Sequence, residues 1–351
     1  MQKKEVVQAV CNAVGVEPPD NRTNKQSNTP SVDIQVFRIL QKAFEQCIPT
    51  IQRKWKYSPD DLKVLSRYCG YYKSPDYLRS KLPEKLHDEA ERLGWFSPSL
   101  KNRLFGWWKQ PSGGIGYWAR ALDNAEPKYL FRSGMLKSIP YLCSEATPSK
   151  PLLAVEGGRD VLALKMMGYR NAIGIGGANF TFPQCRFLAT RFQHIIHIVD
   201  GDLAGLKGVI TTIENASEFG LRMEFVIIPT DSDKDADDYR AEKDHLGFKS
   251  LYDSRVSAGV ALALAYAKLQ SENQVNELRG KILSARSSLS PTDQKDFSQA
   301  LTQFGINEDY RREAIHDLSQ LMNHFSFEEA NRIVAQRHGF SFEVIRSDSN
   351  A

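Results

Sequence analysis

Four short apolar runs constrain the fold of this chain more than any other feature. They occupy residues 152–155, 171–177, 195–199 and 225–229. A helical spacing of apolar residues separates each run from the next. Because strands that alternate with helices form a parallel sheet, this order predicts an α/β fold. In such a sheet, the loops at the carboxyl ends of the strands converge on one edge.

Acidic side chains follow three of these four runs. Glu156 follows the first run, Asp200 and Asp202 follow the third, and Asp235 and Asp237 follow the fourth. Carboxylates that converge on one edge repel each other unless a cation lies between them. Hard oxygen ligands of this kind favour Mg²⁺, so the sequence predicts a magnesium site, with Mn²⁺ as a substitute ion.

A basic and aromatic segment precedes the acidic sheet. Residues 101–150 contain eight Lys or Arg residues and three Asp or Glu residues, which gives the segment a net charge of +5. Within it, residues 102–108 and 115–120 predict two strands of a hairpin joined by a Gly-rich turn. A cationic hairpin beside an acidic edge is the charge arrangement expected where a polyanion lies between the two.

Composition excludes several other classes of protein. The chain has 351 residues, 41% of them hydrophobic and 25% charged, which is typical of a soluble globular protein. It has neither an apolar run as long as a membrane helix nor a signal peptide at its start, so a cytoplasmic protein without membrane contact is expected. Its five cysteines are scattered and form no Cys-x-x-Cys pair, so no zinc site is expected.

The patterning divides the chain into four regions. An N-terminal helical and linker region is expected over residues 1–57, and a basic lobe over 58–150, in which two or three helices precede the hairpin. The acidic sheet occupies residues 151–250. Residues 251–351 are almost entirely helical in pattern and carry no catalytic constellation, so we expect them to pack on a domain or to bind a partner.

Taken together, these motifs resemble the Toprim domain and, within it, the DnaG-type primases of bacteria and phages. In the acidic sheet the resemblance rests on residues 155–160, 174–177, 200–205 and 235–239. Upstream, residues 103–105, 113–120 and 127–130 resemble the basic lobe of the primase catalytic core. The resemblance implies a Toprim-type parallel sheet flanked by helices, a mixed α+β basic lobe before it and a helical C-terminal region.

The resemblance also implies roles for individual side chains. Glu156, Asp200 and Asp202 would be catalytic, and the metal ligands would be these three together with Asp235 and Asp237. Asp160 would be a supporting acid. The residues that contact nucleic acid or nucleotide phosphates would be Arg103, Arg120, Lys128, Tyr129 and Lys137.

The activity implied is that of a DNA primase, a DNA-directed RNA polymerase that makes short RNA primers. Its partners would be single-stranded DNA, ribonucleoside triphosphates and a replicative helicase bound through the C-terminal helices. Such primases commonly carry an N-terminal zinc-binding module, and this sequence has no ligands for one. The resemblance therefore leaves the choice of start site open.

Two other functions stay open on the sequence alone. The same acidic residues would serve a metal-dependent Toprim nuclease, which would cleave single strands where a primase extends them. A non-catalytic adaptor that binds single-stranded DNA or a helicase through its helical region is the second alternative. An adaptor has no use for a complete set of carboxylates, so metal binding distinguishes it from both enzymes.

Overall fold

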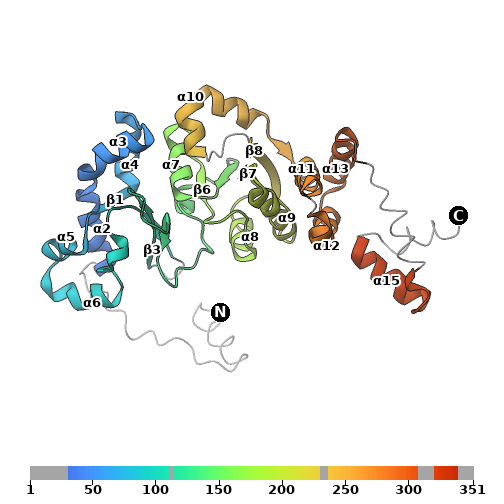
Figure 1. The fold of residues 1–351 in the computed structure, drawn as a ribbon, viewed down its shortest axis with the longest axis horizontal. Coiled ribbons are helices and arrows are strands. Elements are labelled where there is room, and N and C mark those ends of the chain that lie inside the picture. Colours follow the sequence, from blue (N-terminus) through green and yellow to red (C-terminus); the bar gives the residue numbers. More distant parts are fainter. Residues whose placement is uncertain (1–30, 111–113, 230–235, 273, 307–319, 339–351) are drawn as a thin grey trace, which may run out of the picture.

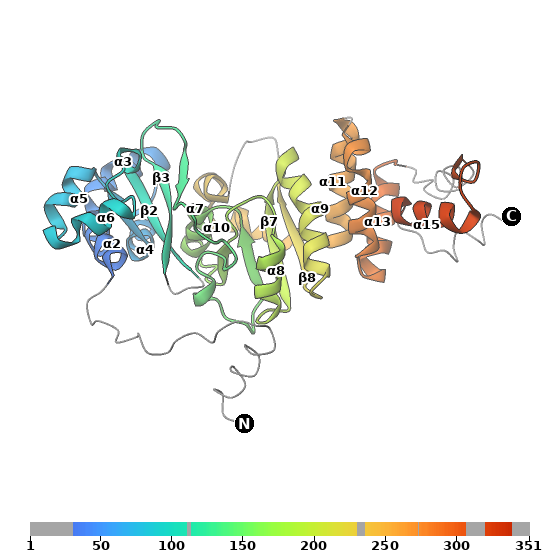
Figure 2. The same cartoon turned by 90° about the horizontal axis from the view of Figure 1, so that it is seen from below.

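The computed structural model describes residues 31–110, 114–229, 236–272, 274–306 and 320–338. The described elements form three bodies in a row (Figure 1). A lobe of helices and antiparallel strands comes first, a parallel sheet lies in the middle, and helices follow at the C-terminal side. The same order is visible from the perpendicular direction (Figure 2). The α/β fold class that the sequence predicts is confirmed.

The N-terminal lobe combines short helices with a four-stranded antiparallel sheet. Its helices are α2 (Val32–Lys42), α3 (Ile48–Trp55), α4 (Pro59–Tyr68), α5 (Pro75–Lys81) and α6 (His87–Arg92). The sheet has the order β1 (Cys69–Tyr72), β2 (Arg103–Lys109), β3 (Ile115–Ala121) and β4 (Tyr129–Phe131). Strands β2 and β3 pair from Arg103 with Ala121 to Lys109 with Ile115, so the predicted hairpin is confirmed.

Strand β1 is a correction to the sequence-based prediction, which filled residues 58 to 95 with helices alone. The strand has only four residues and pairs with β2, which follows it by about 30 positions, so its partner is not visible in the local pattern. Its buried Tyr72 stacks on Phe105 of β2, with ring centroids 5.6 Å apart. Gly70 lets α2 approach the strand, because a β-carbon there would lie 2.7 Å from the backbone of Leu40.

Packing in this lobe also crosses the boundary that the sequence places after residue 57. Val36 and Leu40 of α2 share a core with Trp95 and Phe105. Ile51 of α3 belongs to the core that reaches into the central sheet. The helices before residue 57 therefore form part of the basic lobe, and they bring it against the parallel sheet.

The central sheet has five strands in the order β6-β5-β7-β8-β9. Its parallel strands are β5 (Leu152–Val155), β6 (Ala172–Gly174), β7 (His194–Asp200) and β8 (Arg222–Ile228). These four strands correspond to the four apolar runs of the sequence. The edge strand β9 (Val256–Ser257) is antiparallel to β8 and was not expected, because two residues are too few to give a periodic signal.

Alternate residues of the strands face opposite helical layers. Leu152, Ile195 and Phe225 pack towards α8 (Phe182–Ala189) and α9 (Leu203–Ser217). Leu153, Ile196 and Val226 pack towards α7 (Gly158–Met166) and α10 (Ala236–Asp253). Because both faces are covered, the strands are apolar throughout rather than alternating, as is typical of a parallel sheet.

The C-terminal helices extend the layer formed by α9. Helices α11 (Ala258–Ser271), α12 (Val275–Ser287) and α13 (Pro291–Gln303) share its hydrophobic core, and α15 (Phe327–His338) lies beyond them (Figure 1). Among the helices of the described residues, none combines the length and the apolar character that a membrane-spanning segment requires.

Candidate active site at the carboxyl edge of the sheet

Glu156 and Asp202 follow the carboxyl ends of the adjacent parallel strands β5 and β7. Glu156 directly follows β5, and its backbone oxygen accepts a hydrogen bond of 2.8 Å from Gly176, in the loop after β6. Partial loss of water around the Glu156 carboxylate and the nearby charge of Asp202 raise the pKa of Glu156, while Lys137 opposes the shift. The fold thus holds two negative charges near each other, which a cation between them would stabilise.

The second acidic loop is held by close backbone packing and by a helix cap. Asp200 is the last residue of β7 and is half-buried. Asp202 is the N-cap of α9, where its Oδ1 accepts a hydrogen bond of 2.7 Å from the Gly205 amide. A β-carbon at Gly201 would lie 2.2 Å from the Ile228 carbonyl oxygen. Glycine is therefore required for this turn to pass beside the end of β8.

Asp160 and Lys137 support the loop that carries Glu156. The buried Asp160 accepts a hydrogen bond of 3.0 Å from the Gly157 amide, which fixes the turn between Glu156 and α7. The Nζ of Lys137 donates a hydrogen bond of 2.7 Å to the Gly176 carbonyl and lies 3.9 Å from the centre of the Phe131 ring. Lys137 is thus a cation at the acidic edge, contributed by the segment after β4.

Asp237 lies in a different environment from Glu156 and Asp202. Its carboxylate is 2% exposed and accepts a hydrogen bond of 2.8 Å from the Tyr57 hydroxyl. It also forms ion pairs with Arg159 at 3.4 Å and Arg240 at 3.1 Å. Burial raises the pKa of Asp237, and the two arginines oppose that shift. Asp235, the other acid predicted after β8, lies outside the described residues.

The five predicted phosphate-binding residues divide into inner and outer positions. Arg103 is 1% exposed, and its guanidinium donates to the carbonyls of Ser99 at 2.7 Å and Pro127 at 2.9 Å. Arg120 is also largely buried, and its guanidinium lies 4.7 Å from the centre of the Tyr129 ring. Lys128 is exposed. Arg103 therefore supports the lobe from within, whereas Lys128 faces solvent.

Lys54, at the end of α3, joins this group although the sequence did not single it out as a site residue. Loss of water and the charge of Arg120 lower the pKa of Lys54, as do Arg159 and Lys128, while Asp123 opposes the shift. Cations from α3, β3 and the segment before β4 thus lie near one another, while Arg159 of α7 is ion-paired with Asp237. This concentration of positive charge suits a phosphate backbone.

Comparison with known proteins identifies the fold. Residues 153–240 match the Toprim-like family. The chain is 18% identical to a DnaG catalytic core, with a TM-score of 0.56 over 78% of this chain and 99% of that one. The RNA polymerase domain of Mycobacterium tuberculosis primase DnaG gives a TM-score of 0.59 at 17% identity, over 78% of this chain and 99% of that one. The chain thus has the fold of DnaG catalytic cores, with a Toprim-like domain at residues 153–240.

Curated relatives support the same assignment over a shorter stretch. A DNA primase of Legionella pneumophila is 30% identical over 135 residues, which cover 35% of this chain and 23% of that protein. The DNA primase of Escherichia coli K12 is 31% identical over 133 residues, which cover 34% of this chain and 23% of that protein. The chain thus matches about a quarter of the length of these relatives.

The carboxylates at the edge of the Toprim domain fit a hard divalent cation. Glu156, Asp200 and Asp202 supply only oxygen donors, which Mg²⁺ and Mn²⁺ prefer. Asp202 uses one oxygen to cap α9. Within the described ranges, which omit residues 230–235, no three acidic, histidine or cysteine side chains are close enough to enclose an ion. The described residues thus supply the donor type that such an ion prefers without enclosing an ion by themselves.

Three residues near Asp237 were missed by sequence reasoning: Tyr57, Arg159 and Arg240. Arg240 follows Asp237 by three positions on a helix, a spacing at which opposite charges meet, so this pair was visible in principle. Arg159 precedes Asp160 within the glutamate motif, but nothing in the sequence shows that it turns to Asp237 instead. Tyr57 gives no local signal, because its partner lies 180 residues away.

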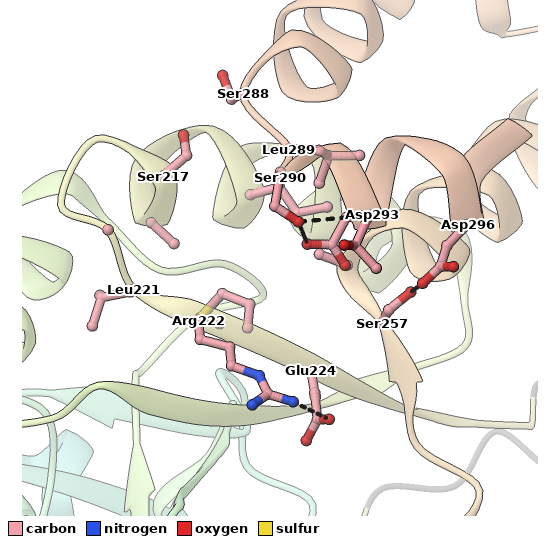
Figure 3. Close-up of a pocket in the computed structure, with 16 residues that line it drawn as sticks. Ser217, Leu221, Arg222, Glu224, Ser257, Ser288, Leu289, Ser290, Asp293 and Asp296 are labelled. Carbon is pink, nitrogen blue, oxygen red and sulfur yellow. Dashed lines mark hydrogen bonds and ion pairs between the residues drawn. The ribbon is translucent and has the colours of Figure 1, made fainter.

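A pocket of about 690 Å³ lies at the other end of the Toprim strands (Figure 3). It is lined by Leu221 and Arg222 at the start of β8 and by residues at the start of α13. Several of its polar side chains pair with one another, as Ser290 does with Asp293 at 2.6 Å. Because acidic residues gather at the carboxyl ends of the strands, this pocket is separate from the candidate active site.

Proposed function

We propose that this chain is a DNA primase that synthesises short RNA primers on single-stranded DNA from ribonucleoside triphosphates. The observation that carries the proposal is the placement of Glu156, Asp200 and Asp202 at the carboxyl ends of the adjacent parallel strands β5 and β7, with Lys137 of the basic lobe bonded to the neighbouring Gly176 loop. The likeness of the fold to DnaG catalytic cores supports it, and one of those cores is described as bound to single-stranded DNA.

Glu156, Asp200 and Asp202 would hold Mg²⁺, and Asp235 stays a predicted ligand from the sequence; both carboxylate oxygens of Asp237, the other predicted ligand, already contact Tyr57, Arg159 and Arg240. When bound, Mg²⁺ lowers the pKa of the primer 3′-hydroxyl and neutralises charge on the leaving pyrophosphate. Two hydrogen bonds anchor the acidic loops and so fix the positions of their carboxylates. The Gly205 amide donates to Asp202, and the Gly176 amide donates to the backbone oxygen of Glu156. Lys137, whose Nζ donates to the Gly176 carbonyl, would meet the triphosphate from the side of the basic lobe.

The basic lobe would hold the template and the nucleotide phosphates. Lys128 is exposed at its surface, and Arg120 with Tyr129 forms a cation–π pair beside it. An aromatic ring flanked by cations suits a single strand, because bases stack on the ring while the charges contact phosphates. Arg103 would act indirectly, since it holds the Pro127 carbonyl next to Lys128.

The substitution Asp202→Asn tests the proposal. Asparagine is also a good N-cap, so α9 keeps its first hydrogen bond while the edge loses one negative charge. We expect primer synthesis on single-stranded DNA with labelled ribonucleotides to fall at least 100-fold, with DNA binding unchanged. The matched control is Asp253→Asn, which removes an exposed carboxylate at the end of α10 that pairs only with Lys249 among the residues described. Undiminished synthesis by Asp202→Asn would contradict the proposal.

The same assay separates the primase from a Toprim nuclease. Labelled single strands are incubated with Mg²⁺, with and without ribonucleoside triphosphates. Elongation that requires the nucleotides supports the primase, and shortening of the strand without them supports a nuclease. A wild-type protein that does neither and binds no divalent ion in calorimetry would be an adaptor.

A replicative helicase is the partner that we propose for the C-terminal region. Helices α11 to α13 bury their apolar residues against α9, so that surface is already occupied. Met322 and Phe325, before α15, are 49% and 46% exposed. The double substitution Met322→Ser and Phe325→Ser should abolish co-sedimentation with the helicase and leave unaided primer synthesis intact.

A further inference from the structure

We propose that Asp237 is a positioning residue through which the N-terminal lobe fixes the glutamate loop of the Toprim domain. Tyr57, Arg159, Asp237 and Arg240 form the contact, which we name the lobe latch. The inference rests on the proposed function, because it assigns these residues to the same metal-binding edge. In this proposal Asp237 positions the glutamate loop through Tyr57, Arg159 and Arg240, and it does not bind the metal ion directly.

Both carboxylate oxygens of Asp237 are held by protein donors. Its Oδ2 accepts from the Tyr57 hydroxyl at 2.8 Å and lies 3.4 Å from the Nε of Arg159. Its Oδ1 accepts from the Nε of Arg240 at 3.1 Å. With 2% of the side chain exposed, the carboxylate is enclosed by these three residues.

Arg240 links this carboxylate to the helices of the N-terminal lobe. One of its terminal nitrogens lies 3.2 Å from the Asp61 carboxylate in the first turn of α4. The other donates to the Trp55 carbonyl at 3.5 Å, and the guanidinium lies 4.6 Å from the centre of the Tyr57 ring. The two arginines of the latch are thus balanced by two acids, Asp237 within the latch and Asp61 beside it.

Arg159 links the same carboxylate to Glu156. It lies in the first turn of α7, three residues after Glu156, and is 3% exposed. Its guanidinium lies between Asp237 and the Trp55 ring, 5.3 Å from the ring centre. Because these contacts hold the Arg159 side chain, they also hold the first turn of α7. The loop that carries Glu156 leads directly into that turn.

A second contact from the N-terminal lobe acts on the same turn. A β-carbon at Gly158 would lie 2.2 Å from the indole nitrogen of Trp118 in β3. The lobe therefore meets the glutamate loop at two neighbouring residues, Gly158 by close packing and Arg159 through Asp237. The position of Glu156 relative to Asp202 consequently depends on how the lobe is docked.

The test uses the substitution Tyr57→Phe in the full chain, which removes one hydroxyl and keeps the ring. We expect Mn²⁺ affinity in calorimetry to weaken about tenfold, and kcat of primer synthesis to fall while KM for ribonucleotides stays unchanged. The matched control is Tyr68→Phe on α4, whose hydroxyl bonds to Glu145 at 3.0 Å, and it should behave as wild type. Affinities are measured far below the urea midpoint of each variant, so a loss of stability alone would not change them.

The substitutions Arg240→Lys and Arg240→Met provide a second test if Tyr57→Phe does not fold. Lysine keeps the charge beside Asp237 and should recover part of the Mn²⁺ affinity that methionine loses. Wild-type Mn²⁺ affinity in Tyr57→Phe or Arg240→Met would overturn the latch, even if the wild-type protein is a primase. Weakened Mn²⁺ binding in a protein that makes no primers would uphold the latch and contradict the proposed function.

Discussion

Gly205 lies so close to Asp200 that a β-carbon at position 205 would come within 2.1 Å of the Asp200 carbonyl oxygen. This approach lets α9 begin directly at the end of β7, with Asp202 as its cap. The two aspartates of the second acidic loop are therefore placed by a glycine that has no chemistry of its own.

Gly205→Ala should destabilise the fold by about 2 kcal/mol, because an added methyl group forces the backbone apart in a packed region. Gly280 is the matched control, since it is exposed in α12 and has no atom within 4 Å of an added β-carbon. Gly280→Ala should stabilise the protein by about 0.5–1 kcal/mol through its higher helix propensity. Urea unfolding measures both, and equal free energies of unfolding for Gly205→Ala and wild type would contradict the packing argument.

We expect Arg103 to have a structural role and Lys128 to bind nucleic acid, although the resemblance to primases assigns both residues to phosphate contacts. Arg103→Met removes the two hydrogen bonds that the buried Arg103 guanidinium donates to the carbonyls of Ser99 and Pro127, so we expect a loss of about 3 kcal/mol in the free energy of unfolding. Lys128→Ala should change that free energy by less than about 0.5 kcal/mol. It should instead weaken binding to single-stranded DNA and reduce the salt slope by about 1.

Fluorescence anisotropy at several salt concentrations and urea unfolding together decide between these roles. If Arg103→Met keeps wild-type stability and loses DNA binding, then Arg103 contacts the nucleic acid after all. If Lys128→Ala binds DNA as tightly as wild type at every salt concentration, then its exposed position is not part of the interface.

His197 should make the stability of the Toprim domain depend on pH. It is buried in β7 between Phe180 and Phe225, and burial lowers its pKa to about 3. The unfolded chain binds a proton near pH 6.5, but the folded chain does not, so folding is favoured fully above pH 6.5 and less as the pH falls. Between pH 6.5 and 5.5 the loss from this group should be about 1 kcal/mol.

Urea unfolding of wild type and His197→Leu at both pH values isolates this contribution, because other titrating groups are common to the two proteins. The free energy of unfolding of wild type relative to His197→Leu should fall by about 1 kcal/mol from pH 6.5 to 5.5. A difference that does not change with pH would show that His197 has the same pKa in the folded and unfolded states.

The parts of the fold that the sequence predicted are those with local signals. The strands that carry Glu156 and Asp200 were found because a strand buried on both faces is a continuous apolar run. Strands β1 and β9 have four and two residues, and their existence depends on partners supplied by tertiary structure. Pattern alone does not reveal such pairing.

The candidate site divides in the same way. Glu156, Asp200 and Asp202 were predicted because each follows an apolar run, and the parallel topology brings the ends of those strands to one edge of the sheet. The sequence does not show whether a basic side chain is buried or exposed. Arg103 and Lys128 are both basic residues of one lobe, yet Arg103 is buried and Lys128 is exposed. The contact between Tyr57 and Asp237 spans 180 residues, and only the folded chain shows it.

Glu156→Gln should raise the stability of the metal-free protein and weaken its binding of Mn²⁺. The pKa of Glu156 is raised in the folded state, so its charged form disfavours folding at pH values above the unfolded pKa. A neutral glutamine removes the repulsion from Asp202 and should raise the free energy of unfolding in EDTA by about 0.5 kcal/mol, the scale of an exposed charge interaction. The same change removes a ligand, so Mn²⁺ should no longer stabilise the variant as it does the wild type. Unfolding with EDTA and with Mn²⁺ measures both effects, and a variant that loses stability in EDTA would show that the Glu156 carboxylate is held by favourable contacts instead.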